Sequence, residues 1–172
     1  MKTPKQSEHE KIIFLDFDGV LNSVGTKDRV IHPLFKRKVR GLDNFRVKLV
    51  SDLAKETGSS IVISSSWRHF YSELQLKVLL YSRGLEHPFI VGVTPTASQE
   101  EGWTSSKMNF ERSDEIQAWM NIHGRPKYFL VLDDLETAFT RNQIKTSDGT
   151  GFFDGLMKRA KSILSIEAEY DS

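Results

Sequence analysis

The fold of this chain is decided by the stretch Ile12-Ile13-Phe14-Leu15-Asp16-Phe17-Asp18-Gly19-Val20-Leu21-Asn22. An apolar run that favours β-structure leads into two carboxylates separated by one residue, and a glycine follows at which the chain can turn away. Open α/β sheets bind ligands at the carboxyl ends of such strands. The alternative is a β-hairpin with an Asp-Gly turn, which does not explain why both acids follow a fully apolar run.

Two kinds of apolar pattern alternate along the rest of the chain. Short apolar runs predict further buried strands at residues 61–63, 89–93 and 128–132, with a weaker apolar segment at 151–153. Helical spacing of apolar residues predicts helices at 44–57, 71–83, 113–122 and 156–166. This alternation predicts an α/β fold, a Rossmann-like three-layer sandwich with a mainly parallel sheet.

Length and composition limit the class of protein. The 172 residues suit a single domain at 11–172, preceded by a polar, flexible tail at 1–10. The absence of cysteine excludes a disulfide, a thiolate nucleophile and a zinc–thiolate site. We find neither a secretory signal nor an apolar run of the roughly 20 residues that span a membrane, and we expect a cytoplasmic protein without a membrane partner. The sequence leaves the oligomeric state open.

Polar side chains follow three of the predicted strands. Asp16 and Asp18 end the first strand, three serines at 64–66 end the second, and Asp133 and Asp134 end the fourth. Because parallel strands end at one edge of a sheet, we expect these side chains to converge. The serines have a second interpretation, since serine often caps a following helix.

Clustered carboxylates suit a specific chemistry. They repel one another unless a cation holds them, and oxygen ligands at this density suit Mg²⁺. One carboxylate can attack phosphorus to form an aspartyl-phosphate, and a second can exchange protons with the leaving oxygen and with water. A cation that balances charge during phosphoryl transfer should complete the site, and Arg112 and Lys107 are the candidates.

These segments, in this order from residue 12 to about 135, resemble the four motifs of the haloacid dehalogenase (HAD) superfamily of phosphohydrolases. The Asp-x-Asp-Gly-Val-Leu-Asn start and the Ser-Ser-Ser-Trp-Arg segment at 64–68 are similar to one subgroup in particular. So are the Arg-x-x-Glu-Ile-x-x-Trp segment at 112–119 and the later Leu-Asp-Asp. That subgroup is the HAD domain associated with Swiss Army Knife RNA repair proteins.

The resemblance implies roles for individual residues. Asp16 would be the nucleophile, and Asp18 the general acid/base with its backbone carbonyl on Mg²⁺. Asp133 or Asp134 would complete the metal site, and the sequence leaves open which of them touches the ion. The implied phosphate-binding residues are Gly19, Ser65 or Ser64, and Arg112 or Lys107. Arg112 stands where many relatives have lysine. Its planar guanidinium would bind the phosphate with two N–H groups, whereas a lysine ammonium acts as a point charge.

The segment 27–48 carries eight basic residues against two acidic ones. It is either a solvated helix face or a basic rim that attracts a polyanion such as a nucleic acid end. The insertions around it are short, so we expect a minimal cap or none, and an open site. Trp67 and Trp119 are expected in the core, and Arg68 is expected to pair with a phosphate or with a neighbouring acid.

Together these features predict a Mg²⁺-dependent phosphatase acting on a phosphomonoester, with a nucleotide or an RNA or DNA end as the expected substrate. Two alternatives stay open. One is a phosphatase of small metabolites or phosphoproteins. The other is a HAD-like module that binds phosphate or nucleic acid without turnover.

Overall fold

A computed structural model describes residues 7–24, 26, 29–30, 39–86, 88–96 and 112–170. Lys107 lies outside the described residues, and so do six of the eight basic side chains of segment 27–48. The prediction of a tail at 1–10 and one domain at 11–172 stays a prediction. Among the described helices, none combines the length and apolar character needed to cross a membrane. The cytoplasmic location likewise stays a prediction.

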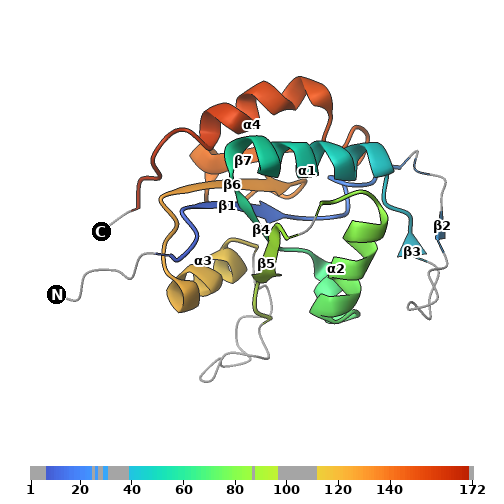
Figure 1. Cartoon of the computed structure of the whole chain (residues 1–172), viewed down its shortest axis with the longest axis horizontal. Helices are drawn as coiled ribbons and strands as arrows, with labels where there is room; N and C mark the ends of the chain where they lie inside the picture. The colour runs from blue at the N-terminus through green and yellow to red at the C-terminus, as the bar shows by residue number, and fades with distance from the viewer. Residues whose placement is uncertain are drawn as a thin grey trace.

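The centre of the protein is a five-stranded parallel sheet (Figure 1). The strands run in the order β5 (Ile90–Val93), β4 (Ser60–Ile63), β1 (Lys11–Leu15), β6 (Tyr128–Asp133) and β7 (Gln143–Lys145). In the central strand, Ile13 aligns with Ile61 on one side and with Leu130 on the other. A central strand has a neighbouring strand on each side, and other elements pack on both faces of the sheet. Its sequence is therefore continuously apolar, and residues 12–15 are fully buried.

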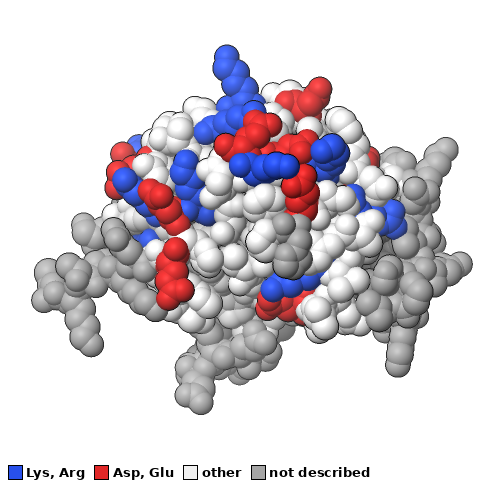
Figure 2. All heavy atoms as spheres, viewed as in Figure 1, with Lys and Arg blue, Asp and Glu red and all other residues white. Residues whose placement is uncertain are grey.

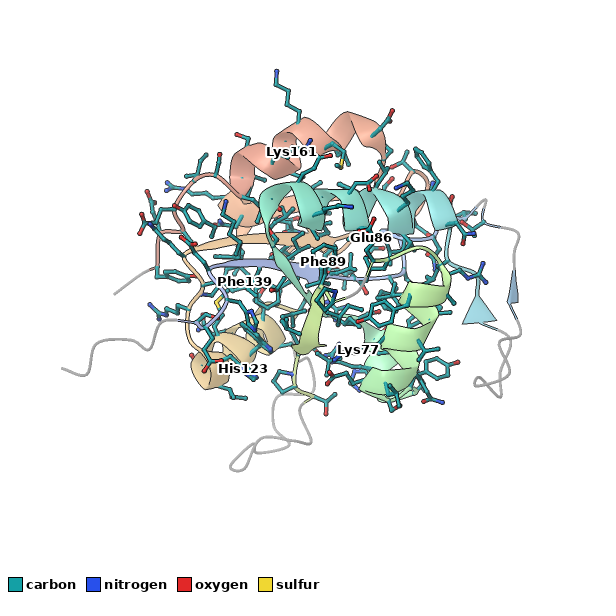
Figure 3. All side chains as sticks on the ribbon, in the orientation of Figure 1. Lys77, Glu86, Phe89, His123, Phe139 and Lys161 are labelled. Atoms are coloured by element: carbon teal, nitrogen blue, oxygen red, sulfur yellow. The ribbon has the colours of Figure 1, made fainter. Side chains whose placement is uncertain are left out.

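Alternate side chains of β1 enter two separate cores. Ile13 and Leu15 pack with α1 (Asn44–Thr57), α2 (Glu73–Ser82) and α4 (Met157–Ile163). Ile12 and Phe14 pack with α3 (Arg112–His123), and Phe139 packs against this second core, edge-on to Phe129 (Figure 3). The two-residue period of a strand therefore builds helical layers on both sides of one sheet. The predicted Rossmann-like three-layer sandwich is confirmed.

Helix ends follow local capping chemistry. Helix α1 has the predicted bounds, because the Asp43 side chain accepts the Phe45 N–H at its start and Gly58 adopts a left-handed φ of 67° at its end. Helix α2 begins two residues later than predicted, because Ser72 and Gln75 form a capping box there.

Several short elements were not predicted. A 3₁₀ helix, η1 (Ser66–His69), follows β4, and an antiparallel pair is formed by β2 (Arg29–Val30) and β3 (Val39–Arg40). The fifth strand is β7, which sequence pattern did not reveal because it carries polar residues at the sheet edge. The apolar segment at 151–153 is not a strand; Phe152 is buried in a loop and donates its N–H to the Val20 carbonyl.

The described part of the insertion between β1 and α1 contains only the β2–β3 pair. No additional domain is present among the described residues on either side of β5. The minimal cap stays a prediction, because parts of both insertions lie outside the described residues. The carboxyl ends of β1, β4 and β6 are the place to look for a site.

Candidate functional site

The carboxyl ends of the three central strands place the predicted polar residues at one edge. Hydrogen bonds extend the sheet into this edge: the Asp16 N–H donates to the Leu132 carbonyl at 3.0 Å, and the Ser64 N–H donates to the Leu15 carbonyl at 2.8 Å. Asp133 is the last residue of β6 and is fully buried. The backbone of the sheet therefore holds these side chains in place, as the topology predicted.

Three carboxylates form a compact cluster there. Asp16, Asp133 and Asp134 each offer an oxygen, and these oxygens lie within 4.8 Å of one another. The backbone N–H of Phe17 donates to Asp16 at 2.7 Å, and that of Leu135 donates to Asp133 at 2.9 Å. Among the described residues, the second oxygen of Asp133 has no hydrogen-bond donor although it is fully buried. Buried oxygen ligands that repel one another and retain free lone pairs fit a hard divalent cation.

Arg112, the first residue of α3, lies against this cluster. Its Nε is 2.8 Å from Asp133 Oδ2, close enough for an ion pair but not aligned as a hydrogen bond. Its Nη2 is 3.4 Å from Asp16 Oδ2. Burial disfavours the charged guanidinium, but Asp16, Asp133 and Glu115 outweigh this effect and raise the pKa of Arg112. The arginine therefore stays charged and partly compensates the acids.

One arginine does not compensate them fully. Burial raises the pKa of Asp16 to about 7; Arg112 lowers it and the charge of Asp133 raises it again. Burial also raises the pKa values of Asp133 and Asp134. In the metal-free protein these groups therefore resist ionisation, and a bound cation would favour their charged forms.

A second buried arginine shares an acid with the first, and this acid stabilises the charged form of both. Glu115 lies one helical turn after Arg112 and accepts its Nη1–H at 3.0 Å. The other oxygen of Glu115 pairs with Nη2 of Arg68, whose side chain is 3% exposed and whose Nη1 donates to the Ser65 carbonyl at 2.6 Å. Arg68 thus pairs with an acid, one of its two predicted partners. Sequence reasoning missed Glu115, although the Arg-x-x-Glu spacing on a helix could have indicated it.

Asp18 lies beside the acid cluster rather than within it. Burial is the largest cause that raises the pKa of Asp134, and the charges of Asp148 and then of Asp18 raise it further. The carboxyls of Asp18 and Asp134 are therefore close to each other. Asp18 Oδ1 accepts from the Asn22 side chain and its Oδ2 from the Trp67 indole N–H, both at 2.8 Å. Trp67 is buried as predicted, but this polar contact was missed; a buried indole N–H usually has a partner.

The predicted phosphate-binding serines differ in their contacts. The Ser65 hydroxyl lies near Asp16 and lowers the pKa of that carboxyl, and it accepts the Trp67 backbone N–H at 3.4 Å as the N-cap of η1. Of the two interpretations of this serine, helix capping is observed, and the phosphate-binding role stays a prediction. The Ser64 hydroxyl is buried and has no hydrogen-bond partner among the described residues.

Gly19 makes a turn that another residue could not make. Its φ is +69°, and a Cβ at this position would lie 2.5 Å from Asp134 Oδ2. Its N–H donates to the Asn22 side chain at 3.1 Å, and the Thr146 hydroxyl donates to its carbonyl at 2.7 Å. The glycine thus allows the turn to approach the acid cluster closely.

Two basic side chains of segment 27–48 are described, and both have local partners. Arg46 pairs with Asp43 at 2.8 Å and donates to the Thr150 carbonyl, and Lys48 pairs with Asp52 at 3.0 Å. Figure 2 shows acidic and basic side chains intermingled over the described residues of this face. The basic rim and the role of Lys107 stay predictions, because they fall on residues outside the described part.

A hollow among the described residues lies away from the acid cluster. It has a volume of about 570 Å³ and lies between α3 and the segments around Phe139 and Tyr170. None of the predicted site residues lines it. The acid cluster instead lies at the carboxyl ends of the central strands, and the open site stays a prediction.

Comparison with known proteins identifies one family. The family model described as the HAD domain in Swiss Army Knife RNA repair proteins matches residues 12–155, which is more than half of the chain. No curated protein and no solved structure matches. The matched range includes every site residue named above.

The raised pKa of Asp16 predicts a pH effect on stability. Between the ordinary value of 3.8 and about 7 the folded protein keeps a proton that the unfolded chain releases, so Asp16 increasingly destabilises the metal-free protein as the pH rises. Asp16→Asn cannot ionise. With chelator, the stability of this variant relative to the parent should therefore increase from pH 5 to pH 7.5, as measured by urea unfolding. A difference that is the same at both pH values would contradict the assignment.

The shared acid of the two arginines predicts a large loss of stability on substitution. Glu115→Gln leaves Arg112 and Arg68 buried without their common counter-charge, and it should cost about 3–5 kcal/mol of unfolding free energy. Glu73→Gln is the control, because Glu73 pairs with the more exposed Lys77 (Figure 3) and should cost less than about 1 kcal/mol. Urea denaturation measures both, and equal losses would show that the buried pairing is not special.

Proposed function

Because the chain belongs to the family of HAD domains in Swiss Army Knife RNA repair proteins, we propose that it is a Mg²⁺-dependent phosphatase that forms an aspartyl-phosphate. The family implies activity of the phosphohydrolase type. The observation that carries the proposal is the contact of Arg112 with Asp16 and Asp133 inside a cluster of three carboxylates. Such a site can hold both a cation and a phosphoryl group.

The proposed reaction has two steps. An oxygen of Asp16 attacks phosphorus; the new P–O bond forms as the bond to the leaving oxygen breaks, and Asp18 gives that oxygen a proton. A water then attacks the aspartyl-phosphate and loses its proton to Asp18. Inorganic phosphate leaves, and both carboxyls return to their starting forms. Asp18 suits the role of general acid/base because its carboxyl lies beside the cluster, where a leaving group and water can reach it.

Asp16, Asp133 and Asp134, with the backbone carbonyl of Asp18, would hold Mg²⁺. The ion would supply positive charge against the acids and the phosphoryl oxygens. Arg112 would bind the phosphoryl group from the other side. Its Nη2 already lies 3.4 Å from the nucleophile, where a phosphoryl oxygen would arrive.

Ser65 is the favoured hydroxyl for the phosphoryl group, because it already lies near Asp16. Ser64, whose buried hydroxyl has no hydrogen-bond partner among the described residues, is the second candidate. The backbone N–H of Gly19 could serve only after it leaves Asn22.

We propose a nucleotide or an RNA or DNA end as the substrate. Two features support it: the family description, which places such domains in RNA repair proteins, and the eight basic residues of segment 27–48. A phosphatase of small metabolites or phosphoproteins is the alternative substrate class. A module that binds without turnover is disfavoured, because the nucleophile, the acid/base and the acid cluster are all present.

Asp16→Asn should abolish phosphate release, because the amide is too weak a nucleophile to attack phosphorus, while the protein stays folded. Asp114→Asn is the matched control, since Asp114 lies in the first turn of α3 but outside the acid cluster, and it should keep the parent activity. Release of phosphate from 4-nitrophenyl phosphate, with Mg²⁺ and with chelator, measures both. Activity that survives Asp16→Asn would refute the aspartyl-phosphate mechanism.

Substrate class is tested with the parent protein on a panel. RNA and DNA oligonucleotides carrying 3′ or 5′ phosphates, nucleoside monophosphates, sugar phosphates and a phosphopeptide are compared at equal concentrations. We expect kcat/KM to be at least about tenfold higher for the best nucleotide or nucleic acid end than for the best other ester, a difference of about 1.4 kcal/mol. A preference for small esters or for the phosphopeptide would keep the enzyme and reject the nucleic acid substrate.

A further inference from the structure

We propose that Trp67 is a positioning residue for Asp18: its indole N–H orients the carboxyl that protonates the leaving oxygen. The inference rests on the proposed function, because it assumes that Asp18 is the general acid/base. It assigns a role to a tryptophan that sequence analysis placed only in the core.

The two donors on Asp18 determine the orientation of its carboxyl. Trp67 Nε1 donates to Oδ2 and Asn22 Nδ2 donates to Oδ1, each at 2.8 Å. Two directional bonds to different oxygens fix both the position and the plane of the group. An ionised carboxylate has about four lone-pair sites, so each oxygen keeps one for proton exchange with substrate or water.

Both donors come from packed positions. The Trp67 side chain is 6% exposed and lies edge-on to Phe17, with ring centroids 5.3 Å apart and an interplanar angle of 70°. Tyr71 packs against its other side at 6.1 Å. Asn22 is fully buried, and its side-chain oxygen Oδ1 accepts a hydrogen bond from the Gly19 N–H. Neither donor can follow Asp18 if that side chain moves, so they restrain it.

The placement of Trp67 indicates that its indole N–H does more than find a hydrogen-bond partner in the core. Ser65 and Trp67 are separated by one residue, as are Asp16 and Asp18. Ser65 lies near enough to Asp16 to lower the pKa of that carboxyl, and the Trp67 indole N–H donates to Asp18. One short segment after β4 thus holds the nucleophile and the acid/base in a matched register. Because η1 begins immediately after Ser65, the backbone of this segment has a defined conformation.

The test compares two aryl phosphates that differ in how much their leaving group needs an acid. Phenyl phosphate releases a phenolate with a pKa of about 10, as for tyrosine, whereas 4-nitrophenyl phosphate releases a far less basic oxygen. The quantity measured is kcat/KM, which reports the step up to leaving-group departure rather than hydrolysis of the shared aspartyl-phosphate. Trp67→Phe keeps a ring but removes the N–H. It should lower kcat/KM for phenyl phosphate roughly tenfold and that for 4-nitrophenyl phosphate less than about twofold.

Three controls make the result decisive. Trp119→Phe changes another buried tryptophan, which packs with Phe14 and His123 away from Asp18, and it should not change the ratio of the two kcat/KM values. If Trp67→Phe is unstable, 3-benzothienylalanine at position 67 removes only the N–H and should give the same selective loss. Asp18→Asn should show a larger selective loss than either.

The outcomes separate the two levels of the argument. One outcome is that Asp18→Asn lowers kcat/KM selectively for phenyl phosphate, whereas the Trp67 variants lower kcat/KM equally for both substrates or for neither. In that case Trp67 does not position the acid, and only this inference is overturned. If Asp18→Asn shows no selectivity, the acid/base assignment in the proposed function fails, and the role of Trp67 fails with it. A selective loss in both supports the inference.

Discussion

The contacts of Arg112 with Asp16 and Asp133 hold together parts of the chain that are distant in sequence. They join the end of β1, the end of β6 and the start of α3 around one buried guanidinium. This cation is needed because three carboxylates share one small volume. Glu115 keeps the guanidinium in place and Arg68 balances Glu115, so the charge network reaches the segment after β4. The charges of the candidate site and the packing of the sheet edge therefore depend on each other.

Asp16 and Asp18 lie two residues apart but in different surroundings. Asp16 is buried among charges, and burial raises its pKa to about 7. Asp18 is only partly buried and lies between the neutral donors Asn22 and Trp67. Differing environments are how one site can give two carboxyls different roles, and under the proposed function these are a nucleophile and an acid/base.

Much of this arrangement could be predicted from local pattern. The apolar run before Asp16 predicted a buried strand, and Gly58 predicted the end of α1; both are confirmed. Strand β7 and the start of α2 were missed or misplaced. An edge strand with polar residues has no apolar signature, and the capping box at Ser72 competes with the apolar pattern around it. The partners of Glu115 and Trp67 were also missed, because the local sequence around a buried acid or an indole N–H does not indicate which residue it will contact.

By itself, the sequence determined the alternation of strands and helices, the polar residues that end the strands and the family to which the chain belongs. These follow from properties of single segments: periodicity, propensity and the order of motifs. Only the tertiary structure decided that Arg112 contacts Asp16 and Asp133, that Arg68 pairs with Glu115, and that Trp67 donates to Asp18. Trp67 and Asp18 lie 49 positions apart in the chain, and such contacts exist only once the parallel sheet brings its strand ends together.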